Sequence, residues 1–133
     1  FKNYDYKIVT EKHKSTKWLK GRYKSKVEYL STGNKDNMLK YIFVMPYNVI
    51  KSLIIFFKFK PSVIVTTGAH TCVPMCYIAK VFRKKVIYIE SFANIETKTL
   101  TGRLIYPIAD IFVVQWKSML KLYPKAVWEG WIF

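Results

Sequence analysis

The sequence predicts an α/β fold, a Rossmann-like doubly wound parallel sheet, and two observations lead to this fold class. Short, almost continuous apolar runs recur along the chain, for example at residues 62–66 and 85–90, and such runs are typical of strands buried on both faces. Segments with helical character separate these runs, as in the βαβ units of a parallel sheet. The chain has 133 residues with neither a linker nor an internal repeat, so we expect one domain over residues 1–133.

The predicted strands are rich in β-branched and aromatic residues, which fit a pleated sheet. The first strand is aromatic and β-branched, the second is weaker, and the next three are nearly all apolar. In chain order the predicted strands cover residues 4–10, 27–30, 62–66, 85–90, 111–114 and, as a last short strand, 126–128.

Helical segments are predicted between the strands, at residues 36–43, 46–58, 71–82, 99–107 and 116–122. Pro46 suits the first turn of a helix, where its missing N–H group costs nothing. Inside a helix the same proline would remove a hydrogen bond, so we expect the segment before it to be a separate short helix.

The helix predicted at residues 46–58 is apolar almost all round, which leaves two alternatives. Such a helix is either deeply buried or partly in contact with lipid or with a partner. The longest uncharged run of the chain, residues 61–79, contains proline, glycine and several threonines. We therefore expect no membrane-spanning helix in this sequence.

The composition is strongly basic, with 23 lysines and arginines against 8 acidic residues and a net charge of +15. This charge favours nucleic acid, an anionic membrane or phosphate-bearing ligands as partners. A hydrophobic fraction of 51% excludes a disordered chain. Cys72 and Cys76 lie one helical turn apart and are expected to be small buried thiols in a reducing compartment. No Cys/His set has metal-ligand spacing, and we expect neither a metal nor a cofactor.

Residues 12–26 contain seven basic residues and no acidic one, with aromatic residues interleaved. Three interpretations stay open for this basic segment: a solvated surface, a contact with an anionic membrane, or a contact with single-stranded nucleic acid. No known nucleic-acid motif accompanies the segment, so we expect no nucleic acid as partner. For the membrane, the residues expected at headgroup level are Lys14, Lys17, Trp18, Lys20 and Arg22.

Two turns that follow predicted strands are candidates for chemistry, because ligands of an open parallel sheet bind beyond the carboxyl ends of its strands. In the first turn Gly68 allows a close backbone approach, and hydroxyl groups and helix-start N–H groups near residues 71–73 would suit a phosphate. Its candidate phosphate-binding residues are Thr67, Gly68, His70 and Thr71. The alternatives are a simple connection and, for His70, a structural hydrogen bond.

The second turn begins at Glu90, a carboxylate at the end of a strand that looks buried. Such a group is costly unless it is hydrogen-bonded or used in function. It would accept a hydroxyl proton, orient a sugar, or cap the next helix. The other candidate ligand-binding residues here are Ser91, Asn94, Thr97 and Thr101. No Ser/His/Asp arrangement and no Gly-rich P-loop occurs in the sequence.

The sequence also resembles a known family over residues 4–133. The resemblance rests on TTGAH followed by a proline, on ESFAN followed by TGR, and on ADIFVVQW. In combination these motifs resemble the family of the asparagine-linked glycosylation protein 14, in its bacterial capsule and exopolysaccharide branch of the PssD/CpsF type.

This resemblance implies a fold and a function. It implies the N-terminal, acceptor-side half of a GT-B glycosyltransferase that is split into two chains, similar to the N-terminal domain of the lipid-linked peptidoglycan N-acetylglucosaminyltransferase. A donor-binding subunit would form a heterodimer with this chain and hold most of the UDP-sugar. Together the two would transfer a sugar to a polyprenyl-diphosphate-linked saccharide at the cytoplasmic face of the cell membrane.

By position, the resemblance places residues 67–74 and 90–94 at the acceptor cleft, with Glu90 as the candidate catalytic residue. Family members usually begin with a strand and a Ser-Gly-Gly-His-Leu turn, so we expect the fold to lack its first strand here. An upstream segment would carry any membrane anchor.

The last residues of the sequence are unusually apolar for a solvated terminus, and aromatic residues favour interface anchors. The split-enzyme interpretation places the contact with the donor-binding subunit at Trp128, Trp131, Ile132 and Phe133. Two further functions stay open. The chain is a non-catalytic membrane scaffold that recruits and activates its partner, or it is a basic nucleic-acid-binding module.

Overall fold

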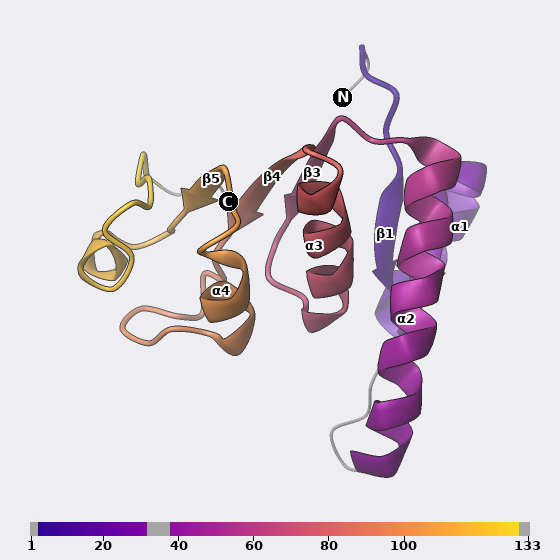
Figure 1. Ribbon diagram of the computed structural model, residues 1–133, viewed down its shortest axis with the longest axis horizontal. Coiled ribbons are helices and arrows are strands. Elements are labelled where there is room, and N and C mark those ends of the chain that lie inside the picture. The colour runs from indigo at the N-terminus through magenta and orange to yellow at the C-terminus, as the bar shows by residue number, and fades with distance from the viewer. Residues whose placement is uncertain (1–2, 32–37, 131–133) are drawn as a thin grey trace. The chain divides into compact units, whose positions relative to one another are not determined.

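The computed structural model describes residues 3–31 and 38–130, and side chains from residue 42 onward in the second range. It divides into two compact units, Phe1–Phe59 and Lys60–Phe133, which are described separately (Figure 1). The single domain expected from the sequence therefore stays a prediction.

The first unit contains two parallel strands, β1 (Ile8–Glu11) and β2 (Val27–Leu30). Their connection is built from a 3-10 helix, η1 (Lys14–Thr16), a short α-helix, α1 (Lys17–Tyr23), and a second 3-10 helix, η2 (Lys24–Lys26). The Tyr29 hydroxyl donates a 2.8 Å hydrogen bond to the carbonyl of Thr16, which ties the connection to β2. Both strands were expected, although the first begins four residues later than predicted.

Helix α2 (Met38–Phe59) is a single helix with Pro46 in its interior, so the prediction of two separate helices was wrong. Pro46 removes only the hydrogen bond to the carbonyl of Ile42. Both residues lie on the exposed side of α2, where water has access to that carbonyl group, and this lowers the cost of the proline.

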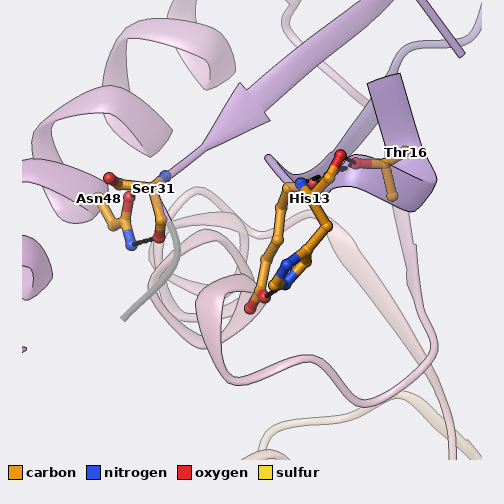
Figure 2. A network of polar contacts seen from close by, with 5 residues as sticks. His13, Thr16, Ser31 and Asn48 are labelled. Atoms are coloured by element: carbon orange, nitrogen blue, oxygen red, sulfur yellow. Dashed lines mark hydrogen bonds and ion pairs between the residues drawn. The ribbon is translucent and has the colours of Figure 1, made fainter. Parts of the chain in front are cut away.

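A buried side chain fixes α2 to the end of β2 (Figure 2). The Asn48 amide nitrogen donates to the carbonyl of Ser31 at 2.9 Å, and its amide oxygen accepts from the Ser31 N–H group at 3.0 Å. Figure 2 also shows the turn after β1, where the Thr16 hydroxyl donates to the carbonyl of Glu11 and accepts from the N–H group of His13. The two bonds of Asn48 satisfy polar groups that burial would otherwise leave unpaired, whereas the bonds of Thr16 close a more exposed turn.

The second unit contains three parallel strands in the order β3 (Val63–Thr66), β4 (Lys85–Ile89) and β5 (Ile111–Val113). In the β3–β4 register Thr66 lies beside Tyr88, and in the β4–β5 register Ile89 lies beside Val113. The carboxyl ends of the three strands therefore share one edge of the sheet. A single parallel bridge from Val113 to Val127 adds the segment that was predicted as a last short strand.

Four helical segments connect these strands: η3 (His70–Cys72), α3 (Val73–Val81), α4 (Leu100–Ile105) and η4 (Lys117–Lys121). Helix α3 packs against β3, β4 and α4 (Figure 1). The segment predicted as a last α-helix forms the 3-10 helix η4 instead. The core between the sheet and these helices includes fully buried Val86, Tyr88, Ile105 and Tyr123.

An ion pair holds the start of β4. The Lys80 ammonium group lies 2.8 Å from one oxygen of Asp110, and the other oxygen accepts a 2.8 Å hydrogen bond from the N–H group of Val86. These two donors lower the pKa of the Asp110 carboxyl group.

Candidate functional site

The turn around Gly68 leaves β3 at the carboxyl edge of the sheet, as predicted. Gly68 has φ +94°, a conformation that favours glycine. The Thr66 hydroxyl donates to the Cys72 sulfur at 2.8 Å, and the Cys72 thiol donates to the carbonyl of Ala69 at 2.6 Å, which closes the turn. Cys76 is fully buried, whereas Cys72 is only half-buried, so the expectation of two buried thiols holds for Cys76 alone.

The anion site expected from free N–H groups at residues 71–73 is reduced in the structure. The N–H group of Cys72 donates to Ala69 at 3.1 Å, and that of Val73 donates to the carbonyl of His70. Both bonds arise because the chain enters α3 through the 3-10 helix η3, whose i to i+3 bonds use these donors. Thr67 is exposed, His70 is half-buried and Thr71 is buried.

Glu90 follows β4 and has only 1% of its surface exposed. Its Oε1 accepts from the N–H group of Ser91 at 2.9 Å, from the Thr99 hydroxyl at 3.1 Å and from the Tyr88 hydroxyl at 3.3 Å. Its Oε2 is within hydrogen-bond distance of the Thr99 hydroxyl at 3.1 Å and of the Tyr123 hydroxyl at 3.4 Å. The carboxylate is thus surrounded by donors from its own chain and presents almost no surface to a ligand.

The strand period of two explains why Tyr88 and Glu90 meet. Val86, Tyr88 and Glu90 alternate with the less buried Ile87 and Ile89, so they lie on the same face of the sheet. Sequence reasoning singled out Glu90 but missed Tyr88, although its position two residues earlier was the available signal.

The beginning of α4 completes the surroundings of Glu90. Thr99 is the N-cap of α4, and its hydroxyl accepts from the N–H group of Gly102 at 2.8 Å. A Cβ atom at Gly102 would collide with Glu90 and would lie 2.6 Å from the Tyr123 hydroxyl. Any other residue at this position would therefore require the side chains around Glu90 to shift.

The buried phenols keep their protons. Burial raises the pKa of both Tyr88 and Tyr123 above the ordinary value, and the negative charge of Glu90 raises them further. Protonated phenols donate hydrogen bonds, so both hydroxyl groups are suited to stabilise the carboxylate.

The predicted ligand-binding residues after Glu90 lie at different depths. Ser91 and Asn94 are half-buried and form one turn, because the N–H group of Asn94 donates to the carbonyl of Ser91 at 3.2 Å. Thr97 is exposed, whereas Thr101 is fully buried within α4. The position of Thr101 therefore favours a role in packing over contact with a ligand.

Two residues that the sequence analysis missed hold the loop at residues 91–98. The Trp116 indole N–H group donates to the carbonyl of Phe92 at 2.8 Å, and the two rings pack with centroids 4.9 Å apart. The Ser118 hydroxyl donates to the carbonyl of Ile95 at 2.7 Å. Both contacts join segments more than 20 residues apart, so local sequence carried no signal for them.

In the first unit every residue of the basic segment at 12–26 is at least partly exposed, and Trp18 exposes 57% of its surface. The Arg22 guanidinium group lies 5.7 Å from the centroid of the Tyr23 ring, and the Lys26 ammonium group lies 4.3 Å from that of Tyr6. This exposure is compatible with all three interpretations of the segment.

One side of α2 carries an exposed apolar stripe, which comprises Phe43, Tyr47, Ile50, Ile54 and Phe57. At 100° per residue these five side chains fall within about 80° of the helix circumference. The opposite side is buried.

Lys51 and Lys58 lie along one edge of the apolar stripe. Together with Lys7, Glu28 and residues of the stripe they line a groove of about 330 Å³. Within this groove Lys7 and Glu28 form an ion pair at 3.3 Å.

The expectation of no membrane-spanning helix needs correction. By length and composition, residues 42–59 of α2 are long and apolar enough to cross a membrane, with a mean hydropathy of 1.6 and 22% of the segment buried. The uncharged-run criterion missed this helix because two lysines interrupt it, and the break expected at Pro46 divided the segment further.

A second groove, of about 300 Å³, lies near the C-terminus. It is lined by Gln115, Trp116, Lys117, Trp128 and Gly130. The Trp128 indole N–H group donates to the carbonyl of Gln115 at 3.3 Å, and 39% of the side chain is exposed. The other three residues predicted to contact a partner, Trp131, Ile132 and Phe133, lie outside the described residues.

Among solved structures, the chain is similar to MurG of Acinetobacter baumannii, with a TM-score of 0.66 and 11% identity over 84% of this chain and 33% of that chain. It is also similar to a UDP-N-acetylglucosamine 2-epimerase, with a TM-score of 0.58 and 11% identity over 92% of this chain and 45% of that chain. At such low identity these similarities show the fold alone. They confirm the predicted Rossmann-like α/β half of a GT-B fold.

Curated relatives include proteins named UDP-N-acetylglucosamine transferase subunit ALG14. The rat protein is 34% identical over 72% of this chain and 47% of the relative, and the Candida albicans protein is 38% identical over 63% and 41%. The human protein is 37% identical over 55% of this chain and 37% of the relative. The chain thus spans less than half the length of these curated relatives. They are eukaryotic proteins and do not confirm the predicted bacterial branch.

A family model described as "Oligosaccharide biosynthesis protein Alg14 like" matches residues 14–132, which is most of the sequence. Together with these relatives, this match shows that the chain belongs to the Alg14-like family of oligosaccharide biosynthesis proteins.

Proposed function

We propose that the chain is the acceptor-side subunit of a two-chain glycosyltransferase that moves a sugar from a UDP-sugar to a polyprenyl-diphosphate-linked saccharide. The observation that carries the proposal is the family match over residues 14–132, with relatives named as transferase subunits. Those names support N-acetylglucosamine as the sugar and a second subunit as the partner. This reaction would serve either bacterial capsule synthesis or the synthesis of lipid-linked oligosaccharides. The saccharide that the enzyme prefers as acceptor distinguishes the two.

In this proposal the acceptor lies along the carboxyl edge of β3 and β4. Thr67 and His70 would face the diphosphate, and Ser91, Asn94 and Thr97 would face the saccharide, because these side chains retain accessible surface. During transfer the acceptor hydroxyl oxygen bonds to the anomeric carbon, the bond from that carbon to UDP breaks, and the hydroxyl proton passes to a base. The donor-binding subunit would hold the UDP-sugar above this edge.

We assign Glu90 a positioning role in this reaction. Its burial to 1% exposure and its five contacts with internal donors argue against direct contact with the acceptor hydroxyl. A carboxylate held in this way fixes the turn that begins at Ser91, and that turn would carry the saccharide contacts.

Membrane association would place the subunit beside its lipid-linked acceptor. We propose that the apolar stripe of α2 inserts at the membrane surface, while Lys51 and Lys58 contact anionic headgroups. Each basic side chain near an anionic surface contributes about 1 kcal/mol, so the exposed basic segment at 12–26 would add to this binding if it faces the same surface. The proposed location is the cytoplasmic face of the cell membrane.

A second candidate function is a non-catalytic scaffold that recruits and activates the donor-binding subunit. The full burial of Glu90 favours it, because the strongest candidate base then has no access to the substrate.

The test is a transfer assay with the full-length protein, its donor-binding subunit, several UDP-sugars and polyprenyl diphosphates that carry one sugar. We expect transfer from UDP-N-acetylglucosamine only when both subunits are present. In Glu90→Gln we expect a raised KM for the acceptor and a fall in kcat of less than about 100-fold, the lower end for loss of a general base. Glu96→Gln, which changes an exposed carboxylate of the same loop, is the matched control.

A larger fall in kcat with complex formation intact would identify Glu90 as the base. Unchanged kcat and KM in Glu90→Gln would favour the scaffold.

A further inference from the structure

We propose that the Tyr88 hydroxyl is a positioning group that holds the Gly68 turn and the Glu90 turn at a fixed spacing. The expected effect of Tyr88 on acceptor binding rests on the proposed function, whereas the structural coupling between the two turns does not.

The register of the sheet brings Tyr88 to both turns. Tyr88 lies beside Thr66, the last residue of β3, so its side chain is adjacent to the turn that begins at Thr67. Glu90 lies two residues further along the same face of the chain. A single side chain at this position therefore reaches two segments that are more than 20 residues apart in sequence.

The hydroxyl of Tyr88 lies beside the position that a side chain at Gly68 would occupy. A Cβ atom placed on Gly68 would lie 3.2 Å from this hydroxyl and 3.8 Å from the ring carbon that bears it. The next nearest atom, the carbonyl oxygen of Ile89, would be 4.0 Å away. The Tyr88 hydroxyl is thus the nearest group to the side of Gly68 on which any other residue would carry a side chain.

The same hydroxyl contacts the second turn through polar groups. It lies 3.3 Å from Oε1 of Glu90 and 3.4 Å from the Thr99 hydroxyl that caps α4. The Tyr88 ring is fully buried and stacks on Phe112 with centroids 4.6 Å apart. Because the ring is fully buried and stacked on Phe112, the hydroxyl is held in place between the two turns.

Tyr123 provides a matched control for Tyr88. It is also fully buried, its hydroxyl lies 3.4 Å from Glu90, and its ring lies 4.5 Å from that of Phe112. Its hydroxyl, however, is not among the three atoms nearest to a Cβ at Gly68. Tyr88→Phe and Tyr123→Phe therefore each remove one hydroxyl group beside Glu90. Only Tyr88→Phe also removes the hydroxyl group that lies beside Gly68.

In the assembled transferase we expect Tyr88→Phe to raise the acceptor KM about 3- to 10-fold, the effect of one lost hydrogen bond or contact, with kcat changed less. Tyr123→Phe should raise the acceptor KM less, and the stability of both variants is measured beside it. Equal KM values for the two variants at equal stability would mean that Tyr88 is merely structural and would overturn the proposal.

The coupling between the turns is measured without any activity. Gly68→Ala brings a Cβ against the Tyr88 hydroxyl, and Tyr88→Phe removes that hydroxyl. We expect Gly68→Ala to raise the unfolding equilibrium constant about 3- to 10-fold less in the Tyr88→Phe background than in the wild type. In the Tyr123→Phe background its effect should equal that in the wild type, because the Tyr123 hydroxyl is not among the three atoms nearest to that Cβ. The strain of the positive φ is common to all backgrounds and cancels in the comparison.

Amide hydrogen exchange decides the same question if Gly68→Ala does not fold. Tyr88→Phe should speed exchange both in residues 67–72 and in residues 91–99, whereas Tyr123→Phe should speed it only in the second segment. Additive free energies in the cycle, or identical exchange at 67–72 in the two variants, would overturn the coupling. A wild-type complex that transfers no sugar would instead refute the proposed function and leave these two measurements valid.

Discussion

Glu90 is a buried carboxylate whose neighbours are hydroxyl and amide donors of its own chain. The sequence predicted that this carboxylate is either used in function or hydrogen-bonded, because an unpaired buried charge is costly. It did not predict the donors, since Tyr123 lies 33 residues away and reaches Glu90 only through the fold. The need of Glu90 for hydrogen-bond donors was therefore predictable from its own strand. The donors that come from distant segments were not predictable from the sequence.

The two buried phenols predict a loss of stability at alkaline pH. The pKa values of Tyr88 and Tyr123 are raised in the folded protein above the ordinary value of 10.0. Their contribution to stability is complete below pH 10 and is lost as the pH rises toward the folded values, because the unfolded state releases these protons first. We expect the free energy of unfolding to fall above pH 10 and to fall less steeply in Tyr88→Phe/Tyr123→Phe.

Denaturant titrations at a series of alkaline pH values test this expectation. Tyr4→Phe is the control, because that tyrosine is 75% exposed and its replacement should leave the slope unchanged. A double variant with the wild-type slope would show that the two phenols do not carry the effect.

Among the elements, α2 departs most from the sequence prediction. A rule that treats proline as a helix start divides this helix at Pro46, yet the helix continues through it from Met38 to Phe59. Strands β3, β4 and β5 were predicted within one or two residues, because buried parallel strands have a clear apolar pattern. The cost of the proline depends on the exposure of one carbonyl group, which the sequence does not show.

The apolar stripe of α2 predicts binding to anionic vesicles. Phe43→Gln/Ile50→Gln/Ile54→Gln should weaken vesicle binding about 100-fold or more, since each of the three partly inserted side chains contributes about 1 kcal/mol or more. We expect the fold to be retained, because these side chains are 58% to 76% exposed, and circular dichroism of the variant checks this. Sedimentation with vesicles that contain phosphatidylglycerol measures the change.

Ile95→Gln/Leu100→Gln is the control for this experiment, because it removes exposed apolar side chains elsewhere in the chain. Unchanged vesicle binding by the α2 variant, together with loss of binding when Lys14, Lys17, Lys20 and Arg22 become Gln, would assign membrane docking to the basic segment instead.

For the whole molecule, composition predicted a basic α/β protein that meets anionic, phosphate-bearing or lipid partners, and the family match is consistent with such partners. Composition indicated neither a sugar nor a second subunit. Those were implied by the family resemblance of three motifs in combination, and the proposal now rests on the relatives named as transferase subunits. A single sequence indicates a partner subunit only weakly, through aromatic residues such as Trp128 that the structure shows to be partly exposed.

The central claim is that this chain binds the acceptor and not the donor. It is tested most directly by the two KM values of Thr67→Ala/Asn94→Ala in the assembled complex, with Ser62→Ala, beyond the opposite end of β3, as control. We predict that the KM for the polyprenyl-diphosphate acceptor rises about tenfold, as two lost hydrogen bonds would cause, while the KM for UDP-N-acetylglucosamine stays within about twofold. A raised KM for UDP-N-acetylglucosamine with an unchanged acceptor KM would contradict the claim.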